Sequence, residues 1–253
     1  MSEPTAKDRS EIEVRPMHRI ARVPIHLTKT RVRRLAMVLV GLDIVFIAAF
    51  LATTMPEVRG LTMTGRLESF DLAVSANLPW TYELAKLAAI AALCALMAYS
   101  YAGDQTPDRF WRLGACVAAV LAVAHAARGY EIWAASVVPT FFGPGIEPSI
   151  AVAVGRLGLF ALFIGGATTL FPAQSRAAFI WLCLAVVGLL AGELGPPAIL
   201  STGVTAPIEP SDAATAWRVG MRLFGESLIL IGLARGLRDI QIATVRYVYR
   251  GES

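Results

Sequence analysis

Nine ionisable residues lie within or at the edges of long apolar stretches of this 253-residue chain. An ionised side chain near the centre of a bilayer costs from about 3 to more than 10 kcal/mol, so such residues normally face a partner or water. They are Asp43, His125, Arg128, Glu131, Arg156, Glu193, Arg218, Arg222 and Glu226. Groups of these types can carry protons, hold a small polar ligand, or pair with one another to fix the packing of helices.

The spacing of these residues predicts two polar stripes on separate helices. Arg218, Arg222 and Glu226 are four residues apart and so share one face of a helix. His125, Arg128 and Glu131 are three residues apart and share one face of another helix. Inward-facing stripes would enclose a polar cluster of mixed sign in the outer half of the membrane. Arg222 and Glu226 are also placed to form an ion pair within one helix.

Three interpretations of these charges stay open. The groups pair with one another and fix the packing of helices, line a hydrated cavity open to the outer side, or contact other subunits. Four of the nine are acidic, four are Arg and one is His, and this balance favours pairing over transport.

No catalytic or metal-binding motif accompanies these charges. The sequence has no HExxH, Walker loop, GxSxG or paired-cysteine motif, and its three cysteines fall singly in three different apolar stretches. The other histidines, His18 and His26, precede the first apolar stretch, so bis-histidine haem is disfavoured. We expect no cofactor and no metal, and enzyme chemistry on a lipid or quinone near His125 and Glu131 has the weakest support.

The apolar stretches themselves predict an all-α fold, a bundle of six membrane-spanning helices. The chain is 56% hydrophobic and 17% charged with a mean hydropathy of +0.59, which is too apolar for the surface of a soluble domain. A hydrocarbon core about 30 Å thick needs about 20 apolar residues in a helix. Suitable stretches cover residues 35–55, 84–101, 111–133, 150–171, 178–194 and 217–237.

Basic residues predict how this bundle is oriented. The arm of residues 1–34 contains nine Lys and Arg residues, and the tail of residues 238–253 is also basic. Because short cytoplasmic segments carry the excess of Lys and Arg, both termini are predicted to be cytoplasmic. Lys86, at the outer start of the second stretch, is expected to extend its ammonium group to the membrane interface.

The amino-terminal arm is a candidate docking segment. Residues 15 to 34 interleave apolar and basic side chains without an acidic one, which suits anionic lipid head groups at about 1 kcal/mol per basic residue. An extended arm that lies along another protein is the alternative. The candidate docking residues are Arg15, Arg19, Arg22, Lys29, Arg31, Arg33 and Arg34.

Small residues at four-residue spacing predict where helices approach closely in lipid. These residues are Gly114, Ala118, Ala122 and Ala126 in the third stretch, Ala161 and Gly165 in the fourth, and Gly232 and Gly236 in the sixth.

The segment from Gly65 to Trp80 contains Phe70-Asp71-Leu72 and then Asn77-Leu78-Pro79-Trp80. It resembles a segment of a family of uncharacterised bacterial polytopic membrane proteins. Those proteins follow the end of their third span with an Asp-Glu pair and then a His-Glu pair. The matching places here are Ala124-His125 and Tyr130-Glu131, so only Glu131 is kept.

The stretch from Arg222 to Leu233, centred on Phe224-Gly225-Glu226-Ser227, resembles the last span of the same family. The resemblance implies a multi-pass protein of the bacterial inner membrane, and it implies no activity. Loss of three of the four polar positions favours a structural role.

Taken together, these features favour a non-enzymatic membrane protein that acts by association, as an accessory or assembly subunit of a larger inner-membrane complex. Its expected partners are the lipid bilayer, anionic lipid head groups and other membrane protein subunits, with no nucleic acid. The alternative is a small transporter or proton-conducting protein that uses Glu226, Asp43, His125 and Arg222.

Overall fold

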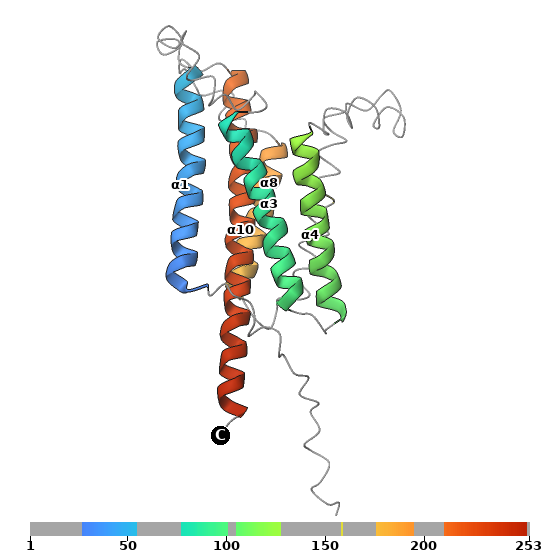
Figure 1. Cartoon of the computed structure of the whole chain (residues 1–253). Coiled ribbons are helices and arrows are strands. Elements are labelled where there is room, and N and C mark those ends of the chain that lie inside the picture. The colour runs from blue at the N-terminus through green and yellow to red at the C-terminus, as the bar shows by residue number, and fades with distance from the viewer. Residues whose placement is uncertain are drawn as a thin grey trace, which may run out of the picture.

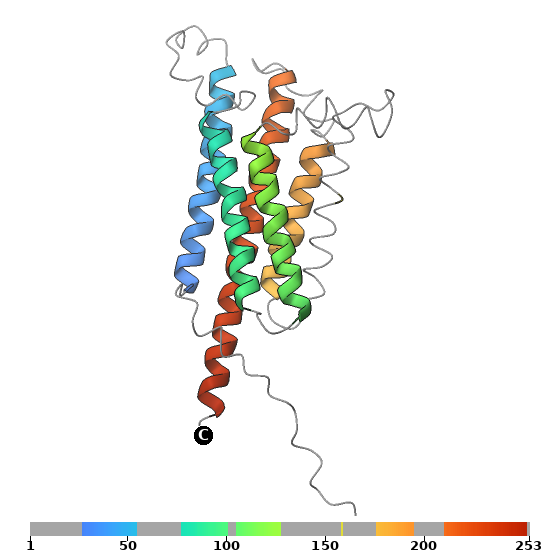
Figure 2. The ribbon, with the colours of Figure 1, turned by 45° about the vertical axis from the view of Figure 1, so that its right-hand side comes forward.

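The computed structural model of the chain describes residues 27–54, 77–100, 105–127, 158, 176–194 and 210–251. Every regular element in these ranges is an α-helix, as predicted. The helices lie side by side with nearly parallel axes (Figures 1 and 2). They are α1 (Lys29–Thr54), α3 (Leu78–Ser100), α4 (Gln105–Ala126), α8 (Arg176–Leu194) and α10 (Pro210–Gly251).

Three of the described helices are long and apolar enough to cross a membrane, over Lys29–Ala52, Leu78–Ser100 and Asp108–Ala126. Helix α8 has a shorter apolar segment, Ala178–Gly192. Charged residues recur along α10, which is not among the three. The predicted span 150–171 lies outside the described residues, apart from Gly158.

The described helices begin earlier than the apolar stretches that predicted them. Helix α3 begins at Leu78, where Asn77 Oδ1 accepts a hydrogen bond of 3.0 Å from the Trp80 amide and so caps the helix. Hydropathy detects only the apolar middle of a helix, whereas the backbone hydrogen bonds continue through polar residues at either end. The 42 residues of α10 make it about 63 Å long, and its last turns extend beyond the other helices (Figure 1).

Helix α10 is the centre of the bundle, because it packs against α8, α1 and α3, while α4 packs against α3. The backbone amide of Leu27 donates a hydrogen bond of 3.2 Å to Gln241 Oε1. The start of α1 therefore lies beside the second half of α10, and the two helices are antiparallel. From Leu228 to Ala234 every side chain of α10 is buried, as expected for a central helix.

Glycines bring α8 and α10 into close contact. A Cβ atom added at Gly225 would lie 2.6 Å from Leu189 Cγ and 3.2 Å from the Ala185 carbonyl oxygen. One added at Gly232 would lie 3.1 Å from Leu182 Cγ. Gly232, which its spacing in the sequence predicted to lie at a helix contact, therefore faces α8. Because glycine has no side chain, the backbones of these two antiparallel helices can lie close together.

Large apolar side chains cover the outer faces of the bundle. Ile44 of α1, Val120 and Val123 of α4 and Val187 of α8 are each at least 60% exposed. Such surfaces are unfavourable in water and suit contact with lipid. A smaller set of charged groups lies inside the bundle instead: Asp43, Glu83, Lys86 and Glu226 are buried.

Candidate functional site

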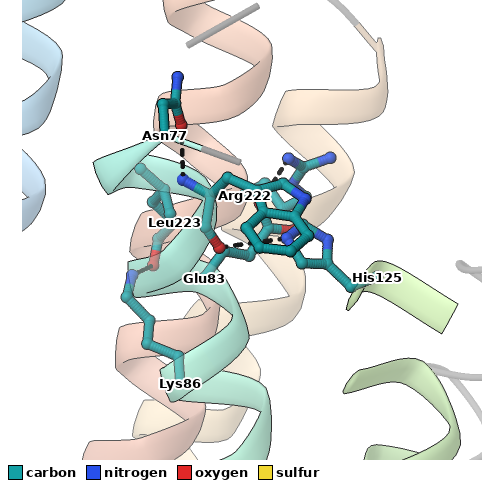
Figure 3. Close-up of polar contacts among 7 residues, drawn as sticks. Asn77, Glu83, Lys86, His125, Arg222 and Leu223 are labelled. Atoms are coloured by element: carbon teal, nitrogen blue, oxygen red, sulfur yellow. Dashed lines mark hydrogen bonds and ion pairs between the residues drawn. The ribbon is translucent and has the colours of Figure 1, made fainter. Parts of the chain in front are cut away.

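Charged side chains from four helices meet inside the bundle and form what we call the buried charge cluster. Asp43, Lys86 and Glu226 are 1%, 2% and 3% exposed. Figure 3 shows part of the cluster, where side chains of α3, α4 and α10 point toward one another. The members are Asp43 of α1, Glu83 and Lys86 of α3, His125 of α4, and Arg222 and Glu226 of α10.

One half of the cluster is an ion pair between α1 and α3. Lys86 Nζ donates a hydrogen bond of 2.7 Å to Asp43 Oδ1 and another of 2.6 Å to the Leu223 carbonyl oxygen of α10. The same ammonium lies 4.3 Å from the centroid of the Tyr82 ring, a cation–π contact. A single side chain thus joins three helices.

The expectation that Lys86 extends to the membrane interface is wrong, because its side chain is only 1% exposed. Helix α3 begins at Leu78, six residues before the predicted start of the span. Lys86 therefore lies about two turns inside the helix and faces α1 and α10, where a carboxylate and a carbonyl oxygen replace water.

Glu83 forms the other half of the cluster. Its Oε2 accepts a hydrogen bond of 2.6 Å from Arg222 Nη2, and its Oε1 lies 3.6 Å from His125 Nδ1. Arg222 and His125, one residue from each predicted polar stripe, therefore meet at a residue of a third helix. Sequence reasoning missed Glu83 because it precedes the expected span, although Glu83 and Lys86 are three residues apart and share a helix face.

His125 lies in the last turn of α4, beside the first turn of α3. Its Nε2 is 3.2 Å from the Trp80 carbonyl oxygen, and its ring stacks on the Trp80 indole with centroids 5.0 Å apart. This places the imidazole near one end of the bundle, whereas counting along the predicted span placed it at mid-depth.

Glu226 and Ser227 are buried next to these pairs. Glu226 lies within electrostatic reach of Asp43, Glu83, Lys86 and Arg222. Three buried oxygen atoms have no hydrogen-bond partner within the described ranges, namely Asp43 Oδ2, Glu226 Oε2 and Ser227 Oγ. Buried polar atoms without a partner are rare in native proteins. Asp43 and Ser227 lie close to each other and to Tyr82, so the Glu226 oxygen is the one that most requires a partner, such as a proton or a water molecule.

No protein-family model, curated protein or solved structure matches this chain. The resemblance to a bacterial polytopic family stays a prediction.

The remaining candidate residues are not brought into the cluster by the described part of the chain. Arg218 is exposed on α10, and Arg128, Glu131 and Arg156 lie outside the described residues, as does the side chain of Glu193. Of the docking residues, Arg15, Arg19 and Arg22 also lie outside. Lys29, Arg31, Arg33 and Arg34 are exposed in the first two turns of α1.

The charges of the cluster do not balance when all of its acids are ionised. It holds three carboxyl groups, two basic side chains and one imidazole. With a neutral imidazole, the described members of the cluster have one negative charge left over, which is costly inside a membrane. One further positive charge, on the imidazole or elsewhere in the cluster, would balance it.

Proposed function

We propose that this chain is a membrane protein that binds and conducts a small cation through the buried charge cluster. The observation that carries the proposal is the Glu226 carboxyl, which is 3% exposed and has an oxygen without a hydrogen-bond partner among the described residues. It lies in a cluster that holds three carboxyl groups, one ammonium, one guanidinium and one imidazole. Ionisable groups inside membrane bundles typically mark ion pathways and proton relays.

The proposed protein is a multi-pass protein of the bacterial inner membrane, with six spans and both termini in the cytoplasm. The bond between Leu27 and Gln241 supports this topology, since it places the basic start of α1 at the same end as the basic second half of α10. Both would then lie on the side of the membrane that holds an excess of Lys and Arg. The alignment of α8 and α10 with the three apolar helices is consistent with further spans (Figure 2).

Ion flux into liposomes tests the conduction directly. The purified chain is reconstituted, a potassium diffusion potential is imposed, and uptake of protons and of sodium is followed in separate assays. We expect uptake of one of the two cations above that of empty liposomes. Glu226→Gln should reduce it to the background because the replacement removes the ionisable group but keeps the side-chain shape.

Arg112→Gln is the matched control. Arg112 belongs to α4, forms its ion pair with Asp108 on the surface, and is 68% exposed, so its loss should leave the flux unchanged. The proposal is wrong if a folded Glu226→Gln protein conducts as well as the unaltered chain, or if the unaltered chain conducts neither cation.

A subunit role is the second candidate, favoured by how the ion pairs are arranged. The pairs of Lys86 with Asp43 and of Arg222 with Glu83 each join two helices, as expected where charges specify packing. In this role the protein acts by association, as an accessory subunit of a larger complex. Affinity purification in mild detergent should then recover further membrane subunits in fixed ratio, whereas a lone, folded monomer would speak against it.

A further inference from the structure

We propose that the cation bound by the buried charge cluster is a proton carried on the Glu226 carboxyl, and that the cluster excludes metal cations. This inference rests on the proposed function, since it names the ion that the same site takes. Three features of the cluster carry it: the positions already filled by basic side chains, the number of free oxygen atoms, and the balance of charge.

Basic side chains already occupy the positions that a metal cation would take. The Lys86 ammonium lies 2.7 Å from Asp43 Oδ1 and 2.6 Å from the Leu223 carbonyl oxygen. The Arg222 guanidinium lies 2.6 Å from Glu83 Oε2. A metal ion would have to displace one of these groups and would be repelled by the other. A proton on Glu226 displaces neither.

The free oxygen atoms are too few for a metal ion. Hard cations such as Mg²⁺ and Ca²⁺ take about six or more oxygen ligands. The buried oxygen atoms without a partner in the described ranges are those of Asp43, Ser227 and Glu226, one from each. In the same part of the chain, no three His, Cys, Asp or Glu side chains converge as metal ligands. A proton needs only one oxygen atom as its bonding partner.

The described groups around Glu226 are consistent with the binding of one proton. In the described ranges they come from α1, α3 and α10, since α8 has no charged side chain between residues 178 and 192. The groups that act on Glu226 are Asp43 of α1, Tyr82, Glu83 and Lys86 of α3, and Arg222 of α10. Ser227 follows Glu226 in sequence, and His125 of α4 lies beside Glu83.

In the proposed step, one proton bonds to a carboxylate oxygen of Glu226, and the carboxylate becomes a neutral acid. Lys86 and Arg222 keep their protons, and the two remaining carboxylates keep their ion pairs. With a neutral His125 the cluster then has no net charge, which is the least costly state inside a membrane. Release of the proton restores one uncompensated negative charge.

His125 and Glu83 are positioned to deliver the proton from one end of the bundle. His125 lies in the last turn of α4, and its Nδ1 is 3.6 Å from Glu83 Oε1. An imidazole has two ring nitrogens, so it can accept a proton at one and donate a proton from the other. The Glu83 carboxyl in turn lies within electrostatic reach of the Glu226 carboxyl, and Arg222 contacts Glu83 without taking part in the transfer, since a guanidinium has no acceptor atom.

Infrared difference spectroscopy on the reconstituted protein tests whether Glu226 holds the proton. A pH change should produce the carbonyl band of a protonated carboxylic acid, and this band should be missing from Glu226→Gln and shifted in Glu226→Asp. Arg112→Gln should keep the band unchanged. Absence of any band assignable to Glu226 would overturn the inference.

Ion substitution on the unaltered chain identifies the conducted ion without any variant. Proton uptake should be equal when choline chloride replaces sodium chloride, and sodium should not enter the liposomes. Flux that requires sodium would overturn the inference while the conduction proposal stands. A Glu226 band without flux of either cation would leave the proton site in place and refute the proposed function.

Discussion

At the scale of single residues, the ion pair between Lys86 and Asp43 dominates the energetics of the cluster. Both side chains are 1% exposed, so each has lost its hydration and depends on the other. Removal of one partner from a buried pair typically costs about 3–5 kcal/mol, because the remaining charge stays buried without compensation. Replacement of both partners by apolar groups of similar size is often neutral.

We therefore expect Lys86→Met alone to lower the free energy of unfolding by about 3–5 kcal/mol. The double variant Lys86→Met with Asp43→Leu should recover most of this loss. Thermal unfolding in detergent, followed by circular dichroism, measures both effects. Arg112→Met at an exposed site is the control and should unfold like the unaltered chain. Equal losses in the single and double variants would show that the two side chains act independently.

The ion pair between Glu83 and Arg222 should contribute less to the free energy of unfolding than the ion pair between Lys86 and Asp43. The Arg222 side chain is 27% exposed and keeps some contact with the surroundings, in contrast to Lys86. Glu83→Gln should therefore lower the unfolding temperature by less than Lys86→Met does. The same variant should slow proton uptake, since it removes the carboxylate between His125 and Arg222. Uptake at the normal rate would remove Glu83 from the proton path.

At the scale of helices, the contact between α8 and α10 depends on the absence of side chains. A Cβ at Gly225 would meet Leu189 Cγ at 2.6 Å, well inside normal contact, and the Ala185 carbonyl oxygen at 3.2 Å. Neither atom can withdraw freely, because Leu189 is buried and Ala185 contributes backbone. Extra volume at such a site forces the two helices apart.

Gly225→Ala should therefore destabilise the bundle by about 1–3 kcal/mol, the usual cost of overpacking. Gly41→Ala is the matched control, since nothing lies within 4 Å of the added Cβ on α1. That change should be neutral or slightly stabilising, because Ala favours the helix. Unfolding temperatures of the two variants in one detergent provide the comparison, and equal values would mean that α8 can shift without cost.

At the scale of the whole molecule, the ends of α1 and α10 report on topology. The start of α1 lies beside Gln241 in the second half of α10. The beginning of α1 and the end of α10 therefore lie at the same end of the bundle. We expect reporter fusions at residue 1 and residue 253 to be cytoplasmic, and a fusion within residues 56–76 to be external. Termini on opposite sides would require an odd number of spans and would contradict the six-span proposal.

The sequence alone predicted that the described apolar stretches are helical and which residues share a helix face, but not where the helices begin or that α10 continues to Gly251. Apolar length predicts the helices, and four-residue spacing places Arg222 and Glu226 on one face. These are local properties, because backbone hydrogen bonds and helical periodicity involve residues only a few positions apart. They were sufficient to select Asp43, His125 and Glu226 as buried polar residues.

Only the tertiary structure decided which helix faces pack against each other. The partners of Lys86 and Glu83 are 43 and 139 residues away in sequence, and no local pattern specifies them. Helical periodicity shows that one face of a helix is polar, but it does not identify the helix that packs against that face. The pairing was decided by packing, because α10 packs against both α1 and α3 and so brings Arg222 beside Glu83 and the Leu223 carbonyl beside Lys86.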